Sequence, residues 1–271
     1  MQTEKEYLYS RAAHPDDTVV EIGGVRIGGG HFALIAGPCA VESRTQLLET
    51  AEAVKQSGAV LLRGGAFKPR SSPYDFQGLG EEGLALLREV GRRTGLPVVS
   101  EILSAEQLPL FEGIDMLQIG ARNMQNYPLL RAVGRSGKPV LLKRGFGCTL
   151  RELLLSAEYL LAEGNPNVVL CERGIRSFEP SERGTLDLAA VPLLHAQTHL
   201  PVLIDPSHAA GQAALVEPLS LAGCASGCDG LIVEVHCDPS AARSDAAQAL
   251  TPAHFDHLAR RVRAIRRALT D

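Results

Sequence analysis

The sequence contains no tryptophan and few aromatic residues of any kind. Phe, Tyr and Trp together make up 4% of the 271 residues. The core must therefore be built from aliphatic side chains, and an apolar total of 45% is typical of a folded chain and excludes a disordered one. The length is compatible with one domain, because α/β barrels often reach about 250 residues.

An excess of charge of one sign is also lacking. The 27 Lys and Arg residues stand against 31 Asp and Glu residues, which gives a net charge of −4. This balance provides no overall basic field that could attract nucleic acid or an anionic membrane surface. We therefore expect no nucleic-acid partner and no membrane partner.

Nothing in the sequence resembles a membrane span, a secretory signal or a disulfide framework. The longest stretch without a formal charge, residues 188–204, is interrupted by two prolines, two histidines and a glutamine. The first 17 residues have no apolar segment after a basic one. The six cysteines show no framework spacing. These absences predict a reduced, cytoplasmic protein.

Short runs rich in Val, Ile and Leu alternate with segments of helical periodicity. The strand-like runs are residues 32–36, 60–63, 98–101, 116–120, 140–143, 168–171, 202–205 and 231–235. Most are almost continuously apolar, as parallel strands buried on both faces are. The main helical segments are residues 45–57, 81–94, 126–135, 150–162, 186–197, 215–224 and 252–269. Eight strand–helix repeats predict the α/β class and a single (β/α)8 TIM barrel.

A short β-hairpin is expected ahead of the barrel. Residues 19–27 have strand-like alternation on both sides of Gly23-Gly24. The predicted organisation is thus an N-terminal segment with this hairpin at 1–30 and a catalytic barrel at 31–271. The hairpin could close the bottom of the barrel or contact another subunit, and we expect a homo-oligomer, either a dimer or a tetramer.

Side chains suited to a metal follow three of the predicted strands. The carboxyl ends of barrel strands meet at one mouth, where the first, seventh and eighth strands are neighbours. Their ends and loops supply one thiol, one imidazole and two carboxylates: Cys39, His208, Glu234 and Asp245. This mixture favours a divalent transition metal such as Mn²⁺, Fe²⁺, Co²⁺ or Zn²⁺ over Ca²⁺.

The other strand ends supply mainly positive charge. The cations are Arg63, Lys68, Arg70, Arg122, Lys143 and Arg173. Six cations at one mouth would repel each other unless anions bind there, and phosphate and carboxylate groups match the guanidinium fork. The pattern predicts a metal site beside a site for phosphorylated substrates.

Two weaker motifs are interpreted as structural. Residues 78–83 match GxGxxG, but they do not directly follow a strand, and Glu81 and Glu82 would repel a pyrophosphate. We interpret this segment as a loop that leads into a helix. Cys224 and Cys228 are four residues apart, and we expect both on one helix face as core residues, because a zinc site would need two further ligands.

Seven long motifs resemble one enzyme family. They are IAGPCAVES (35–43), LRGGAFKPRSSPYDFQGLG (62–80), LQIGARNMQN (117–126), LLKRG (141–145), LCERGIRSFE (170–179), DPSHAAG (205–211) and VEVHCDP (233–239). Over about residues 18–270 the chain is similar to the 3-deoxy-D-arabino-heptulosonate 7-phosphate (DAHP) synthases, in the short bacterial and archaeal branch without a regulatory domain. The resemblance implies metal-dependent condensation of phosphoenolpyruvate with erythrose 4-phosphate, the first step of the shikimate pathway.

The resemblance also implies roles for individual residues. The metal ligands would be the four residues already selected, Cys39, His208, Glu234 and Asp245. The substrate-binding residues would be Arg63, Lys68, Arg70, Ser71, Ala121, Arg122, Lys143 and Arg173. From the layout of the site rather than from the resemblance, we expect Lys68 to assist proton transfer, Glu101 to orient a water, and His236 or Asp205 to support the site; the predicted catalytic residues are thus Lys68, Glu101 and His236. Segments 145–148 and 180–184 depart from the family's commonest pattern, and we expect neither to touch a proposed ligand.

The resemblance also divides the charged substrate-binding residues between the two substrates. Arg122, Lys143 and Arg173 would hold the phosphate of phosphoenolpyruvate, and Arg63 and Lys68 its carboxylate. The phosphate of the sugar would be held by Arg70 and Ser71.

Three alternatives stay open from the sequence. The related 3-deoxy-D-manno-octulosonate 8-phosphate synthases act on arabinose 5-phosphate, but they resemble Lys-Ala-Asn-Arg-Ser where this chain has Lys-Pro-Arg-Ser-Ser at 68–72. A Schiff-base aldolase would use a strand-end lysine such as Lys143 and would need no metal set. A non-catalytic phosphate-binding barrel is the third alternative.

Overall fold

Eight parallel strands form a closed barrel in the computed structural model, which describes residues 7–269. The strands are β3 (Ala33–Gly37), β4 (Leu61–Arg63), β5 (Val98–Glu101), β6 (Met116–Ile119), β7 (Val140–Lys143), β8 (Val168–Glu172), β9 (Val202–Ile204) and β10 (Gly230–Glu234). Each strand pairs with the next in sequence, and β10 closes the barrel on β3, with Glu234 opposite Gly37. The predicted TIM barrel is confirmed.

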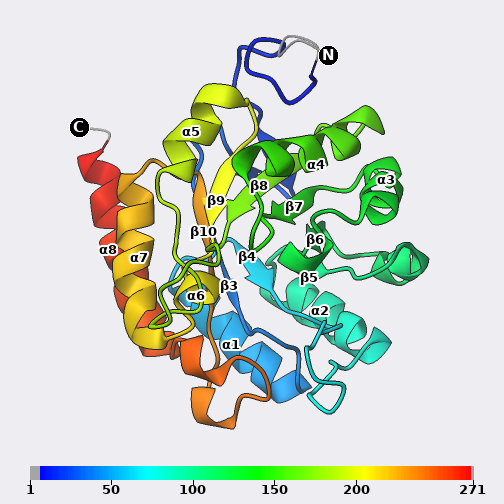
Figure 1. The fold of residues 1–271 in the computed structure, drawn as a ribbon. Coiled ribbons are helices and arrows are strands. Elements are labelled where there is room, and N and C mark those ends of the chain that lie inside the picture. Colours follow the sequence, from blue (N-terminus) through cyan, green and yellow to red (C-terminus); the bar gives the residue numbers. More distant parts are fainter. Residues whose placement is uncertain (1–6, 270–271) are drawn as a thin grey trace.

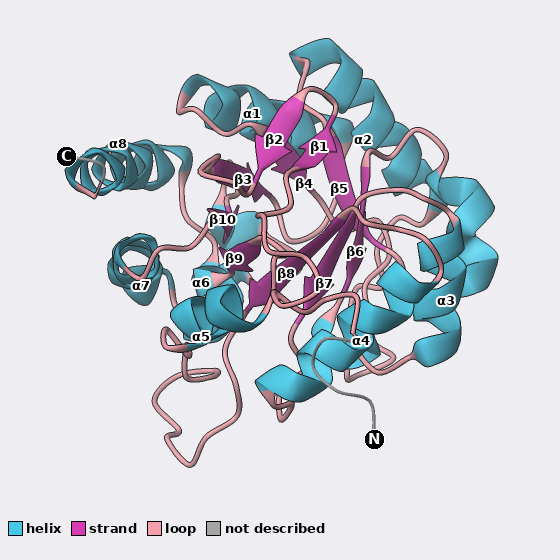
Figure 2. Cartoon of the chain, turned by 90° about the horizontal axis from the view of Figure 1, so that it is seen from above, coloured by secondary structure: helices cyan, strands magenta, loops and turns pink. Residues whose placement is uncertain are grey.

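Helices surround the barrel, as Figures 1 and 2 show. The α-helices are α1 (Arg44–Gln56), α2 (Glu81–Thr94), α3 (Tyr127–Arg135), α4 (Leu150–Ala162), α5 (Ala190–Gln197), α6 (Pro206–Ala210), α7 (Ala213–Ala225) and α8 (Pro252–Ala268). The GxGxxG segment 78–83 runs from a loop into the start of α2 at Glu81, as predicted. None of the described helices combines the length and the apolar character needed to cross a bilayer.

The third repeat departs from the expected strand–helix pattern. Strand β5 is followed by the 3₁₀ helix η2 (Ala105–Phe111) and not by an α-helix. Pro109 lies inside this segment, where its ring removes a backbone donor and disfavours α-helical continuation. Three further short 3₁₀ helices, η3 (Ala121–Asn123), η4 (Pro239–Ala241) and η5 (Ala246–Gln248), lie in loops at the carboxyl ends of strands.

The predicted hairpin consists of β1 (Val20–Ile22) and β2 (Val25–Ile27), and it closes the amino-terminal end of the barrel. Both turn glycines have positive φ, 55° for Gly23 and 86° for Gly24, as a tight two-residue hairpin requires. A Cβ at Gly23 would lie 2.7 Å from Pro97, the residue just before β5. The apolar side chains of the hairpin join one core cluster with the barrel interior.

The cysteine pair in the C-terminal half is buried but does not share a helix. Cys224 lies in the last turn of α7, whereas Cys228 follows the helix end at Ala225. The prediction that both lie on one helix face is therefore wrong, because the chain turns at Gly227, where φ is 91°. Their assignment to the core is confirmed, since neither has measurable exposure.

Candidate active site

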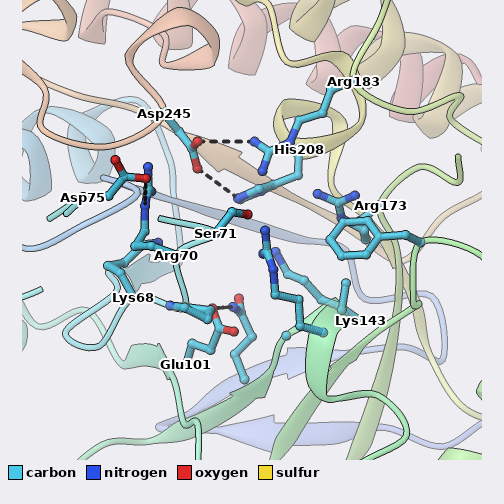
Figure 3. A pocket seen from close by; sticks show the side chains of 16 residues that line it. Lys68, Arg70, Ser71, Asp75, Glu101, Lys143, Arg173, Arg183, His208 and Asp245 are labelled. Atoms are coloured by element: carbon cyan, nitrogen blue, oxygen red, sulfur yellow. Dashed lines mark hydrogen bonds and ion pairs between the residues drawn. The ribbon is translucent and has the colours of Figure 1, made fainter. Parts of the chain in front are cut away.

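A cavity of about 160 Å³ opens at the carboxyl ends of the barrel strands. Figure 3 shows side chains from several loops directed into it. The lining includes most of the substrate-binding residues predicted from the sequence: Lys68, Arg70, Ser71, Ala121, Arg122, Lys143 and Arg173. Glu101, His208 and Asp245 lie in the same wall, so metal-type donors and cations face one space.

The four residues proposed as metal ligands lie together. One potential ligand atom from each of Cys39, His208, Glu234 and Asp245 lies within 4.8 Å of all the others. Cys39 follows β3, Glu234 ends β10, His208 lies in α6, and Asp245 immediately precedes η5. Neighbouring barrel strands thus bring together residues that are about 200 positions apart in the sequence.

The chemistry of this cluster suits a divalent cation. The Sγ atom of Cys39 lies 3.1 Å from Oδ2 of Asp245, and Oε1 of Glu234 lies 3.2 Å from Nε2 of His208. Burial raises the pKa of the Cys39 thiol to about 12, and the negative charge of Glu234 adds to this effect. Burial and the two carboxylates therefore favour the protonated thiol.

His208 is oriented by a buried carboxylate. Asp205 caps the start of α6 by accepting a hydrogen bond of 3.0 Å from the backbone N–H of His208. The other carboxylate oxygen of Asp205 lies 2.7 Å from Nδ1 of the imidazole, so Nε2 faces Glu234 and Asp245. A carboxylate behind the imidazole in this way is the usual support of a metal-binding histidine.

Asp205 also connects the cluster to the cationic side of the cavity. Its carboxylate forms a buried ion pair with Lys143. Burial alone would raise the pKa of Asp205, but the neighbouring His208 and Lys143 outweigh burial and hold this pKa well below its usual value. Asp205 is therefore an anion whose Oδ2 contacts both the imidazole of His208 and the amine nitrogen of Lys143.

Lys68 and Arg63 lie closer to the proposed metal ligands than the sequence suggested. Nζ of Lys68 donates to the carbonyl oxygen of Cys39 at 2.9 Å and lies 3.0 Å from its Sγ. Arg63 is buried, and its guanidinium pairs with Oε1 of Glu234 at 2.9 Å. Lys68 lines the cavity described above, whose lining does not include Arg63. Arg63 neutralises Glu234 in this arrangement.

The two other proposed catalytic residues differ in position. Glu101 lines the cavity and accepts a hydrogen bond of 3.2 Å from the amide of Gln118. His236 is buried, with Nδ1 accepting from the backbone of Asp238 at 3.0 Å and Nε2 lying 3.5 Å from Glu42. The described lining of the cavity does not include His236. Of the two, Glu101 is the one that can face a substrate.

The two segments expected to touch no proposed ligand both reach the site, and one of them contacts a proposed ligand. Nη1 of Arg183 lies 3.3 Å from Oδ1 of Asp245, so the expectation that segment 180–184 touches no proposed ligand is wrong. Phe146 lines the cavity, and the guanidinium of Arg173 lies 4.7 Å from the centre of its ring. Both loops leave the carboxyl end of a strand, which is where loops of a barrel contribute to the site.

Comparison with known proteins identifies the family. The family model described as the DAHP synthetase I family matches residues 11–270. The chain belongs to this family. The resemblance found in the sequence motifs is therefore confirmed, and this DAHP synthetase I family member is an enzyme.

Relatives of this family member include an enzyme from Thermotoga maritima named phospho-2-dehydro-3-deoxyheptonate aldolase. It is 52% identical over 97% of this chain and 78% of its own length. Its crystal structure, described as a DAHP synthase, superposes with a TM-score of 0.95 over the same shares of the two chains. The structure of a truncated form of the Thermotoga synthase is 49% identical in sequence and has a TM-score of 0.91. The match covers 97% of each of the two chains.

The family member is also related to a second group of enzymes, at lower identity. A 2-dehydro-3-deoxyphosphooctonate aldolase from Magnetococcus marinus is 34% identical over 88% of this chain and 90% of its own length. The identity difference between 52% and 34% agrees with the sequence-based preference for the DAHP synthases.

Proposed function

We propose that this DAHP synthetase I family member condenses phosphoenolpyruvate with erythrose 4-phosphate and water, and releases DAHP and inorganic phosphate. The observation that carries the proposal is a cavity whose lining combines two members of the four-donor cluster, His208 and Asp245, with six cationic side chains. These cations are Lys68, Arg70, Arg122, Lys143, Arg173 and Arg183. Two phosphorylated anions and a divalent metal are the partners that such a cavity fits.

The proposed metal site is the cluster of Cys39, His208, Glu234 and Asp245. Its thiol, imidazole and carboxylates fit Mn²⁺, Fe²⁺, Co²⁺ or Zn²⁺. When bound, the metal would supply Lewis-acid polarisation of the aldehyde oxygen of the sugar phosphate.

The cationic wall would orient phosphoenolpyruvate. Arg122, Lys143 and Arg173 would hold its phosphate, and Lys68 its carboxylate. Held in this way, its C3 would face the aldehyde carbon, and the carbon–carbon bond would form between two fixed reactants. Arg70 and Ser71 would hold the phosphate of the sugar at the outer end of the cavity.

Protein groups would also manage the water and the protons. Formation of the new bond at C3 leaves positive character on C2, and water adds to C2. The bond between C2 and the phosphate oxygen then breaks, and this oxygen leaves as part of the inorganic phosphate. Glu101, a carboxylate of the cavity lining, would orient that water. Lys68, which lies beside the cluster, would assist proton transfer at the sugar oxygen.

The structure gives no support to a Schiff-base mechanism. A nucleophilic lysine must be neutral, but the ammonium of Lys143 forms a buried ion pair with Asp205. Its position favours a phosphate-binding role.

Product formation from each of two sugar phosphates tests the proposal. The periodate–thiobarbiturate assay should give a higher kcat/KM with erythrose 4-phosphate than with arabinose 5-phosphate, with one phosphate released per product. Equal kcat/KM for both sugars would contradict the proposed specificity, and a preference for arabinose 5-phosphate would place the enzyme with the phosphooctonate aldolases instead. Covalent trapping by borohydride with substrate present would contradict the metal-dependent route.

A further inference from the structure

One amide side chain connects two charged groups of the cluster region. Gln248 is 2% exposed and ends η5, three residues after Asp245. Its Nε2 donates to Oε2 of Glu234 at 2.6 Å, and its Oε1 accepts from Nη1 of Arg183 at 2.9 Å. A carboxylate only accepts and a guanidinium only donates, so the orientation of this buried amide is fixed at both ends.

The same nitrogen of Arg183 also contacts a carboxylate of the cluster directly. Nη1 lies 3.3 Å from Oδ1 of Asp245, and dashed lines in Figure 3 join Asp245 to both Arg183 and His208. Arg183 thus contacts Asp245 directly and is linked to Glu234 through Gln248. The loop after β8 is thereby connected to both acidic members of the cluster.

These contacts occupy the outer oxygen of each carboxylate. Gln248 holds Oε2 of Glu234 and Arg183 holds Oδ1 of Asp245. The inner oxygens face the cluster, where Oε1 of Glu234 lies 3.2 Å from His208 and Oδ2 of Asp245 lies 3.1 Å from Cys39. Arg63 also donates to Oε1 of Glu234, which has a second lone pair available.

Asp245 needs such support because of its backbone. Within residues 7–269 it is the single non-glycine residue with a positive φ, at 52°. This left-handed conformation is sparsely populated and persists where surrounding contacts hold it. The backbone N–H of Gln248 donates to the carbonyl oxygen of Asp245 at 3.2 Å, so one turn carries both the acid and the amide.

We propose that Arg183 and Gln248 are positioning residues that hold Asp245 and Glu234 in a geometry ready for a divalent cation. The proposal rests on the metal site of the proposed function. Two carboxylates at this distance repel each other, and partners on their outer oxygens limit their movement apart. Neither residue bears a ligand atom of the cluster itself.

Metal affinity tests the proposal without relying on turnover. The full chain, stripped of metal with a chelator, is titrated with Mn²⁺ by calorimetry and with Co²⁺ by visible absorption. Arg183→Met and Gln248→Leu should each weaken Mn²⁺ binding about 10- to 100-fold and change the Co²⁺ spectrum, whereas Arg183→Lys should recover part of the affinity. The double variant should be little weaker than the worse single variant, because both changes break one network.

Arg176→Met is the matched control, because Arg176 is an exposed arginine of the same loop that stacks on Phe146. It should bind Mn²⁺ as the parent does, and thermal unfolding shows whether each variant is folded. Parent-like affinity and an unchanged Co²⁺ spectrum in both Arg183→Met and Gln248→Leu would overturn the inference. A parent that binds Mn²⁺ no better than its Cys39→Ala variant would instead overturn the proposed metal site.

Discussion

Cys39 provides the most direct test of the cluster at the scale of a single residue. It is buried, and its Sγ lies near Asp245 and Lys68. Cys39→Ala should remove the thiolate absorption of the Co²⁺ form and weaken metal binding by more than about 100-fold, because losing a ligand costs more than losing an outer contact. A chelator should abolish activity in the parent, and Mn²⁺, Co²⁺ or Fe²⁺ should restore it.

Cys224→Ala is the control for the loss of a thiol, because Cys224 is buried at the end of α7, away from the cluster. Its metal affinity should equal that of the parent. Full turnover by the metal-stripped parent would contradict metal dependence.

Arg70 should determine how well the sugar phosphate binds. Its guanidinium lies 2.6 Å from Oγ of Ser244 and 3.5 Å from Asp75, so it is held at the outer wall of the cavity. Arg70→Ala should raise the KM for erythrose 4-phosphate, because it removes about 2–5 kcal/mol of binding free energy. The KM for phosphoenolpyruvate should change little. An effect confined to phosphoenolpyruvate would reverse the proposed assignment of the two anion sites.

The environment of His199 predicts that the folded state loses stability at acidic pH. Its Nε2 donates to the carbonyl oxygen of Leu8 at 2.8 Å, so Nδ1 accepts from the hydroxyl of Thr18 at 2.6 Å. Burial lowers the pKa of His199, and the nearby charges of His14 and Arg11 lower it further, against the hydrogen bond to Leu8. Below pH 6.5 the unfolded chain therefore binds a proton that the folded chain resists, and stability falls with acidification.

Urea unfolding at pH 7.5 and 5.5 checks this expectation. The parent should lose more stability between the two pH values than His199→Gln, in which the titrating group is absent. His257→Gln is the control, since His257 is exposed on α8. An identical loss in the parent and His199→Gln would show that other groups cause the acid sensitivity.

At the scale of elements, the β1–β2 hairpin stabilises the end of the barrel opposite the active site. Ile22 is 1% exposed and belongs to the same core cluster as Ile35 and Leu61. Ile22→Ala should reduce the free energy of unfolding by about 2–5 kcal/mol, because it removes buried methylene groups and leaves a cavity. Glu21→Ala, on the exposed face of the same strand, should change stability by less than about 0.5 kcal/mol.

Urea denaturation of both variants provides the measurement, and the kinetic constants should stay close to those of the parent. A large loss of activity in Ile22→Ala at a temperature where it is folded would show that the hairpin acts on the site as well.

The sequence predicts elements well where local pattern and burial agree. The bounds of α2, α4, β5 and β7 match the predicted ranges, because apolar runs and helical periodicity directly reflect which faces are buried. Helix α5 begins at Ala190, four residues later than expected, and η2 replaces an α-helix. The first difference lies next to the long loop after β8, where tertiary contacts decide the path of the chain, and the second contains Pro109, which disfavours an α-helix.

The residues of the candidate site show the same contrast between positions that the sequence predicts and positions that tertiary contacts decide. Residues at or near strand ends, such as Cys39, Glu234 and Lys143, could be placed at one mouth because barrel topology fixes their position. Arg183 and Gln248 could not, since they reach the cluster from within loops by contacts between residues 65 positions apart. Such contacts leave no periodic signal in the sequence.

At the scale of the whole molecule, the concentration of cations around one cavity should link anion binding to stability. Folding brings Arg122, Lys143 and Arg173 to one wall, where burial lowers the pKa of Arg173 and the nearby charge of Arg183 opposes its protonation further. The unfolded chain disperses these groups, so an anion that bridges them binds the folded state far better. Phosphoenolpyruvate should therefore stabilise the fold.

Mass action sets the size of this effect, and thermal unfolding measures it. At 100 times its Kd, phosphoenolpyruvate should add about 2.7 kcal/mol to the free energy of unfolding. For a chain of this size, that corresponds to a rise in Tm of about 5–10 °C. Arg173→Met should lose most of the rise at the same ligand concentration, whereas Arg176→Met should keep it, because Arg176 shares the loop but not the cavity wall. A rise of equal size in both variants would mean that the anion stabilises the protein somewhere other than this wall, and the assignment of its phosphate to Arg122, Lys143 and Arg173 would have to be abandoned.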